Sequence, residues 1–143
     1  MFNYLIKIEY IGTSFVGWQY QKNGDSIQEK IEKALYKIFK KDIRIIGAGR
    51  TDKGVHAKAQ YANFIIENKI KDEKKFINSI NFFLRKTMIS IIDIKKKQLS
   101  FHSRYSAKER VYEYHIINRL GSLSINKNRA WHIKRKLNLS LLK

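Results

Sequence analysis

Residues 2–94 carry a fixed succession of strand and helix patterns, which restricts the fold more than any other feature of this sequence. Residues 2–10 alternate apolar and polar side chains, as a strand with one buried face does. The sequence Ser26-x-x-Glu29 then forms a capping box, and the apolar residues after it predict a helix over 26–41. The same patterns predict strands at 43–46, 58–67 and 88–94, and a second helix from Asp72 to Leu84.

The predicted order is strand, helix, strand, strand, helix, strand. With right-handed crossovers, this order gives an α+β fold of the ferredoxin-like βαββαβ type, an antiparallel sheet of four strands with two helices on one face. A further alternating segment, RVYEYHIIN at residues 110–118, predicts a fifth strand. The last residues, KLNLSLLK, have the pattern of a helix that has barely begun.

The chain carries a large excess of positive charge. It has 30 Lys and Arg residues against 12 Asp and Glu, a formal net charge of +18. An AT-rich genome would raise the lysine content, but it would also raise the glutamate content, and acidic residues are scarce. We therefore favour a polyanionic partner, because charge of this sign and size attracts phosphate backbones.

Composition excludes several classes of protein. The sequence has no cysteine, which excludes disulfides, thiolate catalysis and cysteine-ligated metal sites. The four histidines show no metal-ligand spacing, so no metal site is predicted. No apolar run approaches the ~20 residues of a membrane span, and the N-terminal residues alternate too regularly for a signal peptide. We expect a cytoplasmic protein that does not associate with membranes.

The sequence GAGRTDKGVHA, at residues 47–57, places one carboxylate, Asp52, in a glycine-rich bend. In an extended segment Arg50 would share a face with Asp52, and its charge would stabilise and orient the carboxylate. The glycines allow backbone or ligand to approach closely. Such an aspartate suits nucleophilic or base chemistry, although a surface turn in which Arg50 and Asp52 merely pair explains the spacing equally well.

Four ordered stretches resemble one family of enzymes. The stretch GAGRTDKGVHAKAQ resembles the signature of the TruA-type tRNA pseudouridine synthases, and YIGTSFVGWQYQ resembles the first loop of that family. FHSRYSAKERVYEY resembles the segment that opens its central strand, and NRAWHI the segment that precedes its second half. One departure is Ile11, where the family usually has an aspartate.

The resemblance implies that the chain isomerises uridine to pseudouridine in the anticodon stem-loop of tRNA, without a cofactor. It implies that Asp52 is the catalytic aspartate, that Arg50 enters the RNA helix and holds the flipped state, and that Tyr112 packs on the target base. Whether the aspartate attacks the sugar, attacks the base or removes a sugar proton stays open. The resemblance also makes a homodimer a candidate assembly.

Further candidates for RNA contacts are basic or aromatic. His56 and Lys53 lie inside the signature, and Arg104 and Arg110 follow the fourth predicted strand, where they could hold phosphates. Trp18 could stack on a base, but large aromatic side chains more often pack in a core. Tyr112 also fits the buried face of a strand, which is the alternative to its role at the site.

A non-catalytic RNA-binding module with the RRM topology is the competing hypothesis for function. That module requires an aromatic RNP1 pattern in its third strand, which KAQYANFIIE lacks. A decayed relic is a further hypothesis, but the signature glycines are intact.

By resemblance, residues 1–105 form the ferredoxin-like half that carries the catalytic loop. Residues 106–143 would then form the central strand and the start of an incomplete second half. The expectation is that this chain alone binds RNA weakly and turns over poorly or not at all, because half of the cleft would be missing.

Overall fold

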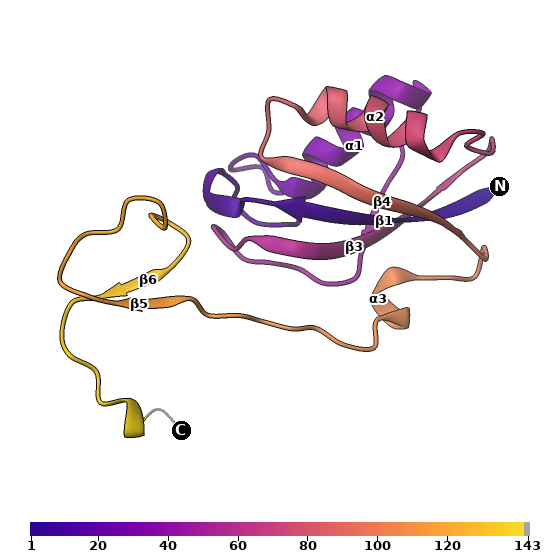
Figure 1. Cartoon of the computed structure of the whole chain (residues 1–143). Helices are drawn as coiled ribbons and strands as arrows, with labels where there is room; N and C mark the ends of the chain where they lie inside the picture. The colour runs from indigo at the N-terminus through magenta and orange to yellow at the C-terminus, as the bar shows by residue number, and fades with distance from the viewer. Residues whose placement is uncertain (142–143) are drawn as a thin grey trace. The chain divides into compact units, whose positions relative to one another are not determined.

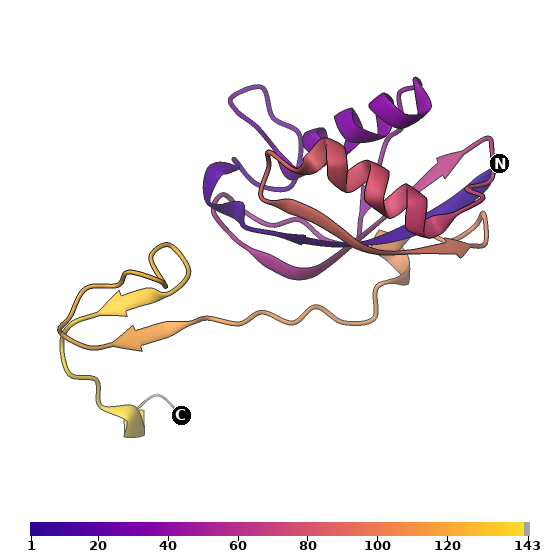
Figure 2. The same ribbon diagram turned by 45° about the horizontal axis from the view of Figure 1, so that its top comes forward.

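The computed structural model describes residues 1–141. The chain divides into two compact units, Met1–Lys108 and Glu109–Lys143. Figure 1 and Figure 2 show the ribbon of the first unit as a sheet with two helices, α1 and α2, over one face. Its elements are β1 (Phe2–Tyr10), the 3₁₀ helix η1 (Gly12–Ser14), α1 (Ile27–Phe39), β2 (Ile46–Gly47), β3 (Ala57–Ile66), α2 (Glu73–Leu84), β4 (Ile89–Lys97) and α3 (Ser103–Ser106).

The four strands form one sheet in the order β2-β3-β1-β4, and every neighbouring pair is antiparallel. The predicted antiparallel sheet and its order of elements are therefore confirmed. On β1 the alternate residues from Tyr4 to Tyr10 are buried, and they meet the apolar stripes of α1 and α2. The core of the first unit lies between the sheet and these helices.

Both predicted helix caps are present. Ser26 Oγ accepts a hydrogen bond from the Glu29 amide at 3.2 Å, and Asp72 Oδ1 accepts one from the Lys75 amide at 2.9 Å. Each bond satisfies an amide that the first turn leaves without a partner. The Glu29 carboxylate pairs with Lys33 at 2.6 Å, one turn along α1.

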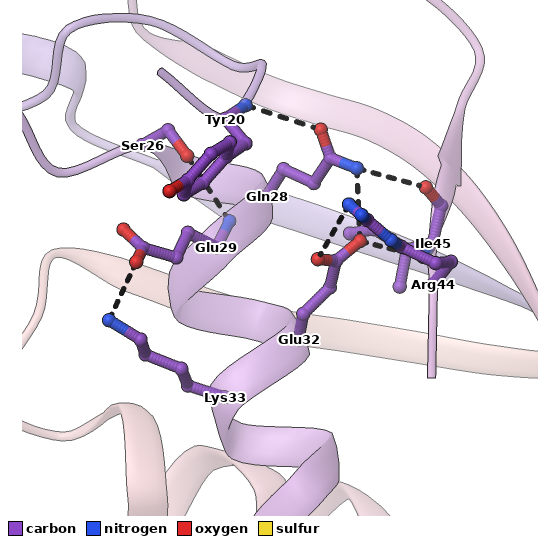
Figure 3. Close-up of polar contacts among 8 residues, drawn as sticks. All are labelled: Tyr20, Ser26, Gln28, Glu29, Glu32, Lys33, Arg44 and Ile45. Atoms are coloured by element: carbon purple, nitrogen blue, oxygen red, sulfur yellow. Dashed lines mark hydrogen bonds and ion pairs between the residues drawn. The ribbon is translucent and has the colours of Figure 1, made fainter. Parts of the chain in front are cut away.

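The edge strand β2 is shorter than its sequence predicts, and α1 supplies the reason. Gln28 Nε2 donates to the Ile45 carbonyl at 3.4 Å, and the Ile45 amide donates to Glu32 Oε1 at 3.1 Å. Arg44 lies 3.7 Å from the same Glu32 carboxylate (Figure 3). The backbone of Ile45 is therefore bonded to side chains of α1 rather than to β3, so the ladder begins at Ile46.

A buried polar cluster covers part of the other face of the sheet. Asn3, expected on the polar face of β1, is fully buried, and its Nδ2 donates to the carbonyls of Gln98 and Phe101 at 3.0 and 2.8 Å. Asn63 Nδ2 donates to Asn3 Oδ1 at 3.0 Å, and the Ser103 amide donates to Asn63 Oδ1 at 2.9 Å. Two asparagines of the central strands thus fix the segment that enters α3.

The second unit differs from the sequence prediction. A strand forms only at β5 (Ile116–Asn118), and it pairs in parallel with β6 (Trp131–Ile133) in a separate sheet. Of the predicted fifth strand over 110–118, residues 116–118 form a strand, which pairs with β6 in the described part of the chain. Residues 110–115 are not part of a strand, although the His115 carbonyl accepts a hydrogen bond from the Trp131 amide of β6 at 2.7 Å.

The last element of the described residues is the 3₁₀ helix η2 (Leu139–Leu141). This turn lies where the sequence predicted the beginning of a helix, a prediction that extends to residues 142 and 143 outside the described range. Asn118 Nδ2 donates to the carbonyls of Ile133 and Arg135, both at 2.7 Å, and so ties the two strands to the segment after them.

Replacing Asn63 by alanine should lower the free energy of unfolding by about 2–3 kcal/mol, because Asn3 Oδ1 and the Ser103 amide would lose buried partners. Urea unfolding followed by circular dichroism measures the change. The control is Asn78→Ala, an exposed site on α2, which should stay within about 0.5 kcal/mol of wild type. Equal effects at both sites would contradict the role of the cluster.

Candidate functional site

The loop of residues 48–56 connects β2 to β3 and carries Asp52. The Ala48 amide donates to the Tyr61 carbonyl at 2.7 Å, which extends the ladder into the start of the loop. Gln60 Nε2 donates to the Gly49 carbonyl at 2.9 Å, and the Val55 amide closes a turn on the Asp52 carbonyl at 3.2 Å. The backbone of the loop is therefore fixed on both sides of Asp52.

Two glycines of the preceding loop pack directly on this backbone. The Gly12 amide donates to His56 Nδ1 at 2.9 Å, and a Cβ at Gly12 would lie 2.0 Å from the Val55 carbonyl oxygen. Gly17 has a φ of +128°, and a Cβ there would lie 2.8 Å from the Thr51 carbonyl oxygen. Any larger residue at either position would push the two loops apart.

The inner side of the loop is joined to the core through Thr51. Its Oγ1 is hydrogen-bonded to the Tyr10 hydroxyl at 2.8 Å, and its carbonyl accepts from the Trp18 amide at 3.0 Å. Burial raises the pKa of the Tyr10 hydroxyl, although hydrogen bonds with Thr51 and Gln60 act in the opposite direction. Tyr10 therefore remains a neutral phenol against the loop.

Trp18 is a core residue rather than a surface for stacking. It is buried, its ring centroid lies 6.2 Å from that of Tyr10, and a Cβ at Gly47 would lie 2.7 Å from its Nε1. The glycine at the end of β2 is thus required by the indole beside it. Gln28 of α1 links the segment before this helix to the segment before β2: its Oε1 accepts a hydrogen bond from the Tyr20 amide, and its Nε2 donates to the Ile45 carbonyl (Figure 3).

Asp52 itself is exposed, as are its neighbours Arg50 and Lys53. Within residues 1–141, Arg50 and Asp52 form no ion pair, and the orientation of Asp52 by Arg50 stays a prediction. Thr51, between them, is bonded to the Tyr10 hydroxyl, while Arg50 and Asp52 are both exposed. The anchored backbone of the loop therefore sets the position of Asp52 in this structure.

The structure places the other predicted site residues as follows. His56 is half-buried and accepts the Gly12 amide bond, so it holds the loop in addition to its predicted RNA contact. Arg104 is exposed on α3 in the first unit. Tyr112 and Arg110 belong to the second unit, where the Tyr112 side chain is 65% exposed rather than buried on a strand face.

The sequence analysis missed the residues that support the site. Gly12 and Gly17 entered only as part of the stretch YIGTSFVGWQYQ, and no role was predicted for Tyr10 or Thr51. A signal was present, since two glycines five residues apart in a loop are typical of close backbone contact, but the sequence does not say which segment approaches. In the part of the chain that the structure describes, no three acidic or histidine side chains gather as metal ligands, and no helix is long and apolar enough to cross a membrane.

Comparison with known proteins identifies the family. The model of the family "tRNA pseudouridine synthase" matches residues 6–106, which include both loops of the site. The chain belongs to this family. The match favours a synthase over the RRM-type module, which the sequence of β3 also disfavours.

Relatives match over nearly the whole chain. The chain is 50% identical over 143 residues to a tRNA pseudouridine synthase A of Pelagibacter ubique (strain HTCC1062), covering 100% of this chain and 58% of that protein. It is 45% identical over 139 residues to one of Ehrlichia ruminantium (strain Gardel), covering 95% and 55%. A third, of Thermoanaerobacter sp. (strain X514), is 42% identical over 143 residues, covering 100% and 58%. The chain therefore spans just over half the length of these relatives.

Replacing Gly12 by alanine should displace the Asp52 loop and lower the free energy of unfolding by about 1–3 kcal/mol, because the new methyl group overlaps the Val55 carbonyl. Urea unfolding measures the stability, and hydrogen exchange of the Val55 and His56 amides reports the loop. The control is Gly121→Ala, where a Cβ meets no atom within 4 Å. Retention of wild-type exchange rates in Gly12→Ala would contradict the close contact.

Proposed function

We propose that the first unit of this chain isomerises uridine to pseudouridine in tRNA, with Asp52 as the catalytic carboxylate. The observation that supports this most directly is an exposed carboxylate whose backbone is fixed on both sides, in a loop that lies inside the family match. The relatives carry the name tRNA pseudouridine synthase A. The anticodon stem-loop, implied by the resemblance, is the proposed region of the tRNA.

The proposed reaction needs little besides a carboxylate. The N1–C1′ bond breaks, the uracil turns, a C5–C1′ bond forms, and the C5 proton leaves while N1 gains one. Substrate and product are isomers, so no oxidant, reductant or hydrolysed nucleotide enters the balance. Asp52 would attack the sugar, attack the base or remove a sugar proton, and each route requires a fixed carboxylate that solvent and substrate can reach.

A paired uridine must leave its helix before Asp52 can act. Extruding a base costs a few kcal/mol, and stacking on an aromatic ring returns about 1–3 kcal/mol. We assign the stacking role to Tyr112, whose ring is exposed, and the role of filling the helix to Arg50, whose guanidinium does not pair with Asp52. Lys53, His56, Arg104 and Arg110 remain the proposed contacts to the RNA backbone.

We further propose that the first unit has the ferredoxin-like fold. Its strand order β2-β3-β1-β4, with α1 and α2 over one face, supports this assignment. The functional division is proposed at residues 1–105 and 106–143. A homodimer is the proposed assembly, and a role in tRNA modification implies a cytoplasmic protein.

Replacing Asp52 by alanine or asparagine should reduce pseudouridine formation by about 1,000-fold or more, since no other group would replace the carboxylate. Tritium release from tRNA labelled at C5 of uridine measures the reaction, under single-turnover conditions with protein in excess. The affinity for tRNA should change by less than about threefold, because one exposed charge among many contacts is removed.

The matched control is Asp42→Ala, which removes the same charge from an exposed site before β2. It should keep both the activity and the affinity of the wild type. The proposal fails if Asp52→Ala retains the wild-type rate of tritium release, or if Asp42→Ala lowers that rate as much as Asp52→Ala does.

A further inference from the structure

The end of α2 presents two aromatic side chains that the core does not use. The buried stripe of this helix consists of Phe76, Ile80 and Leu84. By contrast, Phe82 is 57% exposed and Phe83 is 40% exposed, although helical spacing places Phe83 beside the buried stripe. Their rings meet edge to face, with centroids 5.5 Å apart and planes at 80°. A defined pair of exposed rings is typical of a binding surface.

Three cationic side chains lie around these rings. Lys37 of α1, together with Arg85 and Lys86 after the end of α2, lines one shallow hollow with Phe82 and Phe83. None of the described residues that line it is acidic. The Arg85 guanidinium lies 3.9 Å from the centroid of the Phe82 ring, and its Nη1 donates to the Phe82 carbonyl at 2.7 Å. We call these five residues the aromatic-basic patch.

The patch lies at the same end of the sheet as the Asp52 loop. The chain runs from Lys86 directly into β4, whose first residue, Ile89, pairs with Tyr10. The Ile11 amide donates to the Met88 carbonyl at 2.9 Å, and the Tyr10 hydroxyl is bonded to Thr51 beside Asp52. In both views the connection from α2 to β4 lies at the end of the sheet where β1 ends (Figure 1 and Figure 2).

We propose that the aromatic-basic patch binds an unpaired segment of the RNA substrate. Bases stack on Phe82 and Phe83, while Lys37, Arg85 and Lys86 contact the phosphates on either side. Every base has a face that can stack on an aromatic ring, so this kind of site tolerates any sequence but requires unpaired nucleotides. The proposal deepens the proposed function and rests on it, because it takes RNA as the partner and adds a second contact beyond the Asp52 loop.

Charge argues against a second copy of the chain as the occupant. If two copies met at this patch, Lys37, Arg85 and Lys86 of one copy would face the same three cations of the other. A stable dimer also needs about 800 Å² from each partner, which two half-exposed phenylalanines do not supply. A polyanion that carries planar rings matches both the cations and the aromatic side chains.

The test measures binding of the full chain to a short oligouridine and to an RNA duplex of the same length, by fluorescence anisotropy. The double variant Phe82→Ser/Phe83→Ser should bind oligouridine about 10-fold or more weakly. Its affinity for the duplex should change less than about twofold, because paired bases do not expose their faces. Equal losses for both ligands, or no loss for oligouridine, would overturn the proposal.

A salt titration tests the cations. Arg85→Ala should lower the slope of log K against log salt for oligouridine by about 0.7, the contribution of one phosphate contact. The matched control is Lys74→Ala, which removes a charge at the opposite end of α2 and should leave the slope unchanged. Equal slopes for Arg85→Ala and wild type would contradict the phosphate contact.

Cross-linking locates the contact independently of catalysis. Irradiation with oligouridine that contains 5-iodouridine should label the tryptic peptide of residues 76–85, and this label should survive in the Asp52→Ala variant. If Asp52→Ala loses pseudouridine formation but keeps the cross-link, RNA binding at the aromatic-basic patch is separated from catalysis by Asp52. A label confined to other peptides, or a serine double variant that changes only the oligomeric state, would overturn the patch as an RNA site.

Discussion

The contact between two loops of the first unit determines whether the candidate site exists. Gly12 and Gly17 lie so close to the backbone of residues 51–55 that neither position accommodates a Cβ without movement. Because this contact is made by backbone, it fixes the path of the loop without using its side chains. Asp52 is then free to face solvent, while Thr51 next to it is held against the core by the Tyr10 hydroxyl.

The rest of the first unit supports that contact from two directions. On one side, α1 bonds the backbone on both approaches to the site, through Gln28 and Glu32. On the other face of the sheet, Asn3 and Asn63 hold the segment that leads into α3. These side-chain bonds satisfy backbone groups where the ladder stops, so irregular segments become as well defined as the strands beside them.

This arrangement suits a reaction that depends on position more than on activation of the catalytic group. A carboxylate on an anchored loop loses little conformational freedom when a nucleoside arrives. The positive charge of the chain suits a polyanionic partner in general, whereas the aromatic-basic patch is proposed to select unpaired nucleotides near the same end of the sheet. In the proposed function, positioning the uridine and binding the flanking RNA are therefore roles of different surfaces of one small unit.

The sequence by itself determined the order of the strands and helices, both helix caps, the position of Asp52 and the family, because periodicity, capping and signature residues are local patterns. It did not determine that Gly12 and Gly17 lie against the backbone of residues 51–55. It also did not determine that Asn3 is buried, or that β5 pairs in parallel with β6. Those outcomes depend on which distant segments lie beside each residue, and only the tertiary structure decides that.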